Sequence, residues 1–140
     1  MIVYLVRHGR AGQRAEWQGD DRVRPLDERG LRQAKALVDQ LAGRDFERIF
    51  SSPYARCVET VRPLAEARGL PVEAEEALAE GAGTEAPLRL LRGAGEAVVA
   101  SVHGDLVEEL LGEKLKKGAT AVLELGDSGV DVLERLPRPA

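Results

Sequence analysis

The chain has 140 residues, enough for one domain that buries a hydrophobic core without disulfides. With 44% hydrophobic and 31% charged residues it has the composition of a globular protein, and no apolar run approaches the roughly 20 residues of a membrane-spanning helix. The net charge of −4 argues against a nucleic-acid-binding protein, because such domains usually carry a basic stripe. We therefore expect a single domain over 1–140 that binds neither nucleic acid nor membranes.

Cysteine usage and local charge refine this expectation. Cys57 is the only cysteine, so it cannot form an internal disulfide, and a lone thiol fits the reducing cytoplasm. We expect it to be buried and unreactive on a helix. Residues 1–24 carry five arginines against three acidic residues, although the whole chain is acidic. This local excess fits either a solvated basic loop or a focused anion site.

An uncharged apolar segment, 2–6, opens the chain and predicts a β-strand buried on both faces. Arg7 and His8 follow at its carboxyl end, and Gly9 comes next. Ligands of open α/β sheets bind outside the carboxyl ends of the strands, and Gly9 would let the backbone turn sharply beside a bound group. The charged, aperiodic segment 10–25 that follows predicts a long functional loop.

A helix is predicted next, with Asp27 as its N-cap and Gly43 at its end. Its apolar positions repeat at helical spacing: Leu31, Ala34, Val38 and Leu41. The segment 48–51 predicts a second strand. Ser52 and Pro53 predict the start of the next helix, with serine at the N-cap and proline at the first helical position.

This second helix is predicted to end at Gly69 and to bury Val58, Val61, Leu64 and Ala65. A short strand over 70–73 then leads into a glycine- and alanine-rich loop, 77–84, and a short helix over 84–91 that Thr84 would cap. The predicted elements that complete the chain are a buried strand over 97–102, a helix capped by Asp105, and two closing strands over 120–125 and 130–136.

His103 follows the predicted strand 97–102 and precedes a glycine, as His8 does after the first strand. Carboxyl ends of parallel strands meet at one edge of a sheet, so the two imidazoles could meet there. Arg56 lies on the first turn of the helix opened by Ser52, where free N–H groups already favour an anion. These groups together favour binding of a tetrahedral oxyanion such as a phosphoryl group.

Four strings of the sequence resemble the histidine phosphatase superfamily, also called phosphoglycerate-mutase-like. They are Leu-Val-Arg-His-Gly (5–9), Arg-Pro-Leu-Asp-Glu-Arg-Gly-Leu-Arg-Gln-Ala (24–34), Ser-Ser-Pro-Tyr-Ala-Arg-Cys-Val-Glu-Thr (51–60) and Ser-Val-His-Gly (101–104). The short chain is most similar to the SixA-type phosphohistidine phosphatases. The resemblance implies a three-layer α/β/α sandwich with a mostly parallel central sheet, and a site without metal or cofactor.

The resemblance also assigns roles to residues. It implies that Arg7, His8, Arg56 and His103 form the phosphate pocket, with His8 as the nucleophile. Glu80, in a Leu-Ala-Glu string, resembles the general acid of larger family members, although SixA-type members tend to lack it. Nearby acidic alternatives are Glu75, Glu76 and Glu85.

Gly9 and Arg24 are further candidates for substrate binding, and Arg10, Arg14 and Arg22 are weaker ones. Trp17 could contact a substrate or only hold its own loop.

The expected function is a metal-independent phosphatase that acts on phosphohistidine or on a small phosphomonoester, in the cytoplasm. Its partner would be a phosphorylated small molecule or a phosphohistidine protein. A mutase is an alternative, but it must shield a phosphoenzyme from water, and this chain has little extra sequence for a lid. A phosphate- or phosphoprotein-binding module without turnover is another. The loops 10–25 and 77–86 contain no motif that selects a substrate.

Overall fold

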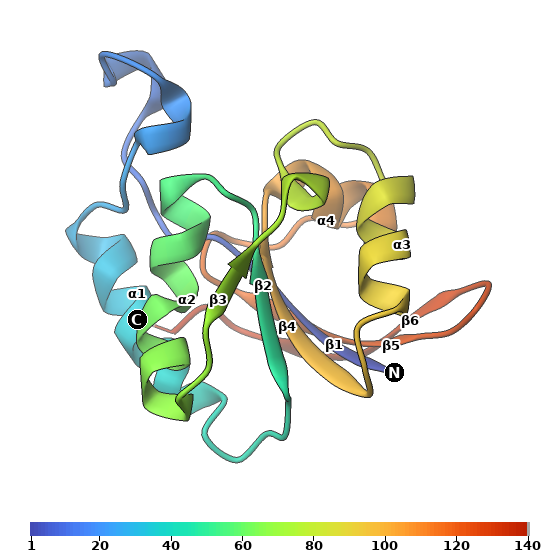
Figure 1. The fold of residues 1–140 in the computed structure, drawn as a ribbon. Coiled ribbons are helices and arrows are strands. Elements are labelled where there is room, and N and C mark those ends of the chain that lie inside the picture. Colours follow the sequence, from blue (N-terminus) through green and yellow to red (C-terminus); the bar gives the residue numbers. More distant parts are fainter. Residues whose placement is uncertain (140) are drawn as a thin grey trace.

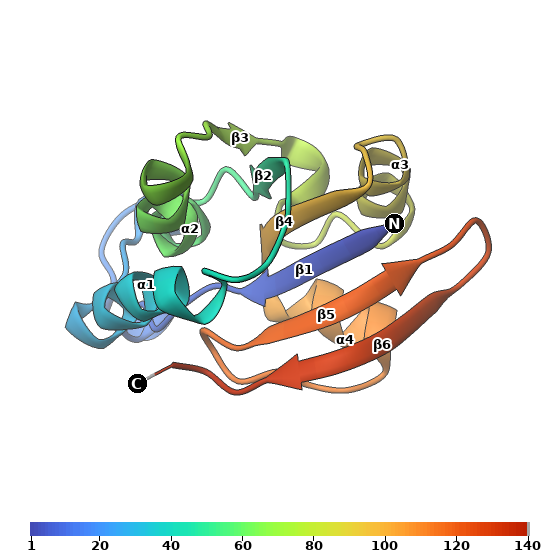
Figure 2. The same ribbon diagram turned by 90° about the horizontal axis from the view of Figure 1, so that it is seen from below.

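The apolar N-terminal segment forms β1 (Ile2–Arg7), inside a six-stranded sheet with the order β3-β2-β4-β1-β5-β6 (Figures 1 and 2). The computed structural model describes residues 1–139. The other strands are β2 (Arg48–Ser51), β3 (Val72–Ala74), β4 (Ala97–Val102), β5 (Thr120–Leu125) and β6 (Val130–Leu136). Strands β3, β2, β4 and β1 run parallel, whereas β5 is antiparallel to β1 and β6 to β5.

Four helices cover the two faces of this sheet. Helices α1 (Glu28–Gln40) and α2 (Ala55–Arg68) lie on one face, and α3 (Glu85–Arg92) and α4 (Gly104–Leu111) on the other (Figure 1). A hydrophobic core lies on each face of the sheet, and alternate residues of β1 belong to one core or the other, because side chains of a strand alternate between its faces. Val3 and Leu5 belong to the core of the α3 and α4 side, and Tyr4 and Val6 to that of the α1 and α2 side. The predicted three-layer α/β/α sandwich is confirmed.

The sequence pattern predicted the α1 core only in part. Asp27 is its N-cap, and the Asp27 carboxylate accepts a hydrogen bond from the Gly30 N–H at 2.8 Å. Of the expected core residues, Ala34 and Leu41 are buried and Val38 is half-buried, but Leu31 is 47% exposed. The helix also buries Gly30, Gln33 and Leu37. The helix ends at Gln40, before Gly43, because Leu41 leaves helical geometry as the C-cap.

The predicted start of α2 is wrong by two residues. The helix begins at Ala55 with Tyr54 at the N-cap position, and the Ser52 Oγ, ahead of the helix, pairs with His103 at 2.8 Å and accepts the Tyr54 N–H at 3.3 Å. The predicted end is confirmed: Gly69 closes α2 in the left-handed conformation, with φ of 65°.

Three smaller expectations also need correction. Strand β3 covers Val72–Ala74 rather than 70–73. Thr84 stands at the N-cap position of α3, but its side chain makes no capping hydrogen bond. Asp105 does not cap α4, because the helix already begins at Gly104 with His103 at its N-cap position; the Asp105 carboxylate accepts a hydrogen bond from the Gly81 N–H at 2.9 Å.

Candidate active site

The two histidines meet at the carboxyl edge of the sheet. In the parallel pairing of β1 with β4, Arg7 stands opposite Val102, so the next residues, His8 and His103, leave the sheet side by side. Their ring centroids are 5.5 Å apart, with the planes at 68° to one another. Two imidazoles that are distant in the sequence therefore share one site, as the order of the predicted strands indicated.

His8 is held as a neutral imidazole with one free nitrogen. Its Nδ1 lies 2.8 Å from the carbonyl oxygen of Gly9. A carbonyl can only accept, so Nδ1 carries the proton and Nε2 keeps its lone pair. Burial lowers the pKa of His8 to about 3, and the neighbouring charges of Arg56, His103 and Arg7 add to this effect. Burial makes the largest contribution to this shift.

Arg56 is the buried cation of the site. The second residue of α2, it is 1% exposed. Its Nη1 donates to the backbone carbonyl of Asp21 at 3.0 Å and its Nη2 to the Asp21 carboxylate at 3.1 Å, so it ties the loop 10–25 to the helix. Its Nε is buried without a hydrogen-bond partner. A buried guanidinium with an unused donor is suited to an anionic ligand.

Arg7 packs against the start of α4. Its Nη1 donates to the carbonyl of Leu115 at 2.6 Å, and its buried Nε has no partner. A Cβ on Gly104 would lie 2.9 Å from the Arg7 Cζ, closer than van der Waals contact. The glycine after His103 therefore leaves room for the Arg7 guanidinium.

His103 is positioned through its Nε2, which lies 2.8 Å from the Ser52 Oγ. The ring is 1% exposed, and burial followed by the charge of Arg56 lowers its pKa to about 4. The Cys57 Sγ lies 3.6 Å from Nε2, and burial raises the pKa of this thiol to about 12. Cys57 is thus buried, as expected, and held in its unreactive protonated form.

Glu80 lies at the site as an ion-pair partner. Its two carboxylate oxygens accept hydrogen bonds from the Arg14 Nη2 at 3.0 and 2.9 Å. One of them also lies 3.6 Å from the Arg56 Nη2 and 3.9 Å from the His103 Nδ1. The alternatives are placed elsewhere: Glu76 pairs with Arg22, Glu85 pairs with Arg89, and Glu75 does not line the pocket.

Gly9 and Arg24 have structural contacts that the sequence did not predict. The Gly9 N–H donates to the Thr60 hydroxyl at 2.9 Å, so it is already engaged, and a Cβ on Gly9 would press on Gly30 of α1. Arg24 is buried and donates to the Ala11 carbonyl at 2.7 Å and to the Asp21 carboxylate at 2.9 Å.

The other candidates of the loop 10–25 take different places. Arg24 and Arg14 still line the pocket, whereas Arg10 pairs with Asp27, and the Trp17 indole donates to the Asp20 carbonyl.

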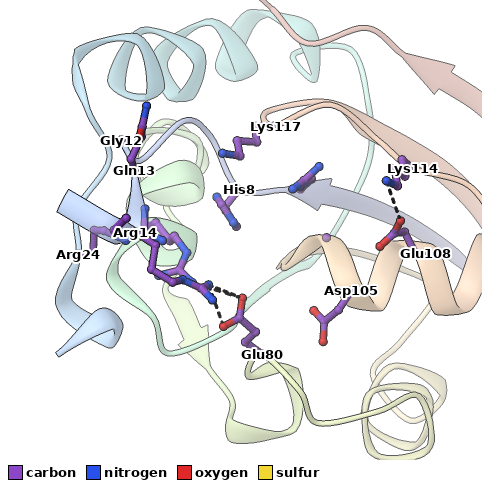
Figure 3. Close-up of a pocket in the computed structure, with 14 residues that line it drawn as sticks. His8, Gly12, Gln13, Arg14, Arg24, Glu80, Asp105, Glu108, Lys114 and Lys117 are labelled. Carbon is purple, nitrogen blue, oxygen red and sulfur yellow. Dashed lines mark hydrogen bonds and ion pairs between the residues drawn. The ribbon is translucent and has the colours of Figure 1, made fainter. Parts of the chain in front are cut away.

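A pocket of about 630 Å³ opens over His8. Its charged lining comprises six cations and three carboxylates: Arg7, Arg14, Arg24, Arg56, Lys114, Lys117, Glu80, Asp105 and Glu108. Figure 3 shows Lys117 on one side of His8 and the Arg14–Glu80 pair on the other. The two lysines were missed in the sequence because the segment after α4 has no motif. The signal that could have found them is the group of three lysines, Lys114, Lys116 and Lys117, just before β5.

Among residues 1–139, no three His, Cys, Asp or Glu side chains are grouped so that they could hold a metal ion. Across the same residues, every helix is too short or too polar to cross a bilayer.

The model of the histidine phosphatase superfamily, branch 1, matches residues 3–86, more than half of the chain. The chain belongs to the histidine phosphatase superfamily. An 8-oxo-(d)GTP phosphatase of Mycolicibacterium smegmatis is 37% identical to it over 152 residues, which cover 94% of this chain and 47% of that protein. The transcription factor tau 55 kDa subunit of Saccharomyces cerevisiae is 37% identical over 90 residues, covering 56% of this chain and 20% of the relative. The chain thus spans about half the length of the first of these relatives, and less of the second.

Solved structures share the fold of this superfamily member. The protein histidine phosphatase SixA, complexed with tungstate, superposes with a TM-score of 0.82 at 24% identity, covering 99% of this chain and 97% of SixA. A mycobacterial glucosyl-3-phosphoglycerate phosphatase complexed with VO3 has a TM-score of 0.77 at 17% identity, covering 99% of each chain.

Proposed function

We propose that the protein is a metal-independent phosphatase, one histidine phosphatase domain over 1–140, that hydrolyses phosphohistidine or small phosphomonoesters through a phosphohistidine intermediate on His8. The observation that supports this most directly is the state of His8, whose Nδ1–H is bound to the Gly9 carbonyl at 2.8 Å. The pKa of about 3 keeps its Nε2 lone pair available at neutral pH. A nucleophile that is neutral, oriented and surrounded by cations is what in-line attack on a phosphate dianion requires.

In the first step the His8 Nε2 lone pair attacks phosphorus, and the bond from phosphorus to the leaving oxygen or nitrogen breaks. The bonding pair departs with the leaving group. Arg7, Arg56 and His103 donate to the non-bridging oxygens and offset the charge that develops there. In the second step water attacks the same phosphorus, the P–N bond breaks, inorganic phosphate leaves, and His8 regains its lone pair.

Glu80 is the proposed proton carrier for these steps. It would protonate the leaving group in the first step and take a proton from water in the second. In the arrangement described above it is bound to Arg14, so proton donation requires that pair to open. The free energy needed to open the Arg14–Glu80 pair disfavours alkoxide leaving groups, which need the proton, and favours labile ones, such as the imidazole of a phosphohistidine.

A nucleotide phosphatase is a second candidate. It is supported by the 8-oxo-(d)GTP phosphatase of M. smegmatis, which is 37% identical over 94% of this chain. The buried, lone Cys57 fits the reducing cytoplasm, which we propose as the compartment of either activity.

The test is phosphate release in EDTA from a panel containing a phosphohistidine protein, p-nitrophenyl phosphate, guanosine triphosphate and deoxyguanosine triphosphate. We expect turnover in EDTA and a phosphoenzyme trapped by alkaline quench, which preserves the P–N bond, that is absent in His8→Asn. A His8→Asn variant that folds and retains full activity would refute the mechanism. Binding of phosphate without turnover of any substrate would identify a binding module, and loss of activity in EDTA would identify a metal enzyme.

A further inference from the structure

Two cations of the pocket, Arg7 and Lys117, have no carboxylate partner. Of the six cations that line it, four form ion pairs: Arg14 with Glu80, Arg24 and Arg56 with Asp21, and Lys114 with Glu108. Among residues 1–139, no carboxylate lies within 4.0 Å of Arg7 or Lys117. Glu108 faces Arg7, and Asp27 faces Lys117, from a greater distance. Cations that the fold leaves uncompensated are suited to bind an anion.

Lys117 is held in place by the backbone that follows it. The Gly118 N–H donates to the carbonyl oxygens of both Arg7 and His8, each at 3.0 Å. Gly118 has a φ of 87°, and a Cβ there would lie 3.1 Å from the Gln33 side chain, so a larger residue would disturb this contact. The half-buried Lys117 is thereby fixed to the end of β1, beside the candidate nucleophile.

The charged groups that act on Lys117 are mostly cations. Burial lowers its pKa, and Arg7, Arg24 and Arg10 lower it further, in that order. Arg7 also lowers the pKa of His8, and the three residues line the same pocket. Its buried Nε has no hydrogen-bond partner. Arg7 therefore shares the pocket with His8 and Lys117 and has a buried donor that no protein group uses.

We propose that Lys117, together with Arg7, binds a second phosphate group of the substrate, next to the phosphoryl group that His8 attacks. The substrate class is then an organic diphosphate. The phosphoryl group that His8 attacks already has Arg7, Arg56 and His103 as its proposed donors, so Lys117, which lines the same pocket, is left for a second anionic group. Because Lys117 is anchored one residue from the backbone contact to His8, the second anion must lie close to the first, as the two phosphates of a diphosphate do.

This assignment rests on the proposed phosphatase activity and deepens it. The His8 Nε2 attacks the terminal phosphorus, the bond to the bridging oxygen breaks, and the electron pair leaves on an organic monophosphate. Lys117 stabilises the negative charge that this leaving phosphate gains. The leaving phosphate needs no proton, so the Arg14–Glu80 pair can stay closed during the step.

The test compares three competitive inhibitors of p-nitrophenyl phosphate hydrolysis in EDTA: methylphosphonate, methylenediphosphonate and phosphonoacetate. The variant is Lys117→Met, and its matched control is Lys116→Met, which removes the same charge from an exposed neighbour outside the pocket. We expect Lys117→Met to weaken methylenediphosphonate about tenfold more than methylphosphonate, as expected for one lost charge-assisted hydrogen bond. Lys116→Met should leave all three inhibition constants unchanged.

Equal losses for methylenediphosphonate and methylphosphonate would place Lys117 at the transferred phosphate and overturn the second subsite. An equally large loss for phosphonoacetate would overturn the diphosphate class, because a carboxylate would serve as well. If the wild-type protein turns over none of the substrates in the panel described above, the proposed function fails. The same three ligands, measured by calorimetry on the same variants, then decide the subsite separately.

Discussion

At the scale of residues, each imidazole uses one nitrogen for the scaffold and presents the other to the site. We assign the Ser52 hydroxyl as the donor to His103 Nε2 at 2.8 Å, because the Ser52 Oγ also accepts the Tyr54 N–H at 3.3 Å and a proton on Nδ1 would face the Glu80 carboxylate. The proton of His103 is then on Nδ1, which lies on the side of Glu80. His8 thus offers a lone pair and His103 a proton, although both rings are neutral and buried.

Ser52→Ala tests this division of roles. Without the hydroxyl, His103 can shift its proton to Nε2, so we expect kcat to fall about tenfold, equivalent to one lost hydrogen bond, with a smaller change in KM. The control is Ser51→Ala, which also removes a buried hydroxyl, one bound to the Ser52 carbonyl. Steady-state kinetics and melting temperatures of both variants are the measurement. Equal kcat losses in the two variants would show that Ser52 only supports the fold.

Glu80→Gln tests the proton carrier. The amide keeps the size of the side chain but cannot release or accept the proton, so hydrolysis of an alkyl phosphate should fall by at least about tenfold. Phosphohistidine hydrolysis should fall less, since imidazole leaves more easily than an alkoxide. The ratio of kcat/KM for the two substrates measures this effect. A constant ratio would remove Glu80 from the proton transfer and leave it as the partner of Arg14.

At the scale of elements, the site depends on how closely α1 approaches the turn after β1. A Cβ on Gly30 would overlap the carbonyl oxygen of Arg10, whereas Gly43, beyond the same helix, has open space around it. Alanine normally favours a helix over glycine by about 1 kcal/mol. Here we expect the reverse: Gly30→Ala should lower the free energy of unfolding by about 2 kcal/mol or more, and Gly43→Ala should change it by less than about 0.5 kcal/mol. Urea denaturation of both variants gives the comparison, and equal stabilities would contradict the close approach.

The strands could be predicted from the sequence better than the helix starts. The segments 97–102 and 120–125 are largely apolar, whereas 48–51 and 130–136 place apolar residues beside charged ones, and all four are strands over those bounds. The start of α2 was misplaced because serine is a common N-cap residue, but the Ser52 hydroxyl is hydrogen-bonded to His103, which is distant in the sequence. Local patterns cannot reveal such a contact.

The residues of the site also differ in whether the sequence could predict their positions. His8 and His103 could be paired from the order of strands, since the parallel register brings their strand ends together. Lys117 could not, because its position depends on the contacts of Gly118 with the end of β1. Leu31 looked like a core residue by spacing alone, but the helix turns Gly30 and Gln33 inward, toward the turn after Gly9.

At the scale of the whole molecule, folding buries two histidines in their neutral forms. Both rings are at least nine-tenths buried beside Arg56, and their pKa values are lowered from 6.5 to about 3 for His8 and about 4 for His103. The unfolded chain binds protons on both residues as the pH falls below 6.5, whereas the folded protein does not. Stability therefore rises with pH across this interval and is lost as the pH falls from about 6.5 toward 4.

We expect the free energy of unfolding to drop by about 2 kcal/mol for each histidine between pH 7 and pH 5, a range above the titration of most carboxylates. Urea denaturation at half-unit steps of pH measures the slope. His8→Gln should lose about half of it whatever its stability at pH 7, because only His103 then titrates. The same low pKa matters for the mechanism, because a nucleophile with a pKa of about 3 stays unprotonated from pH 7 to pH 5. A stability that is flat between pH 7 and pH 5 would mean that the folded protein also takes up these protons, and His8 could then not be the neutral nucleophile.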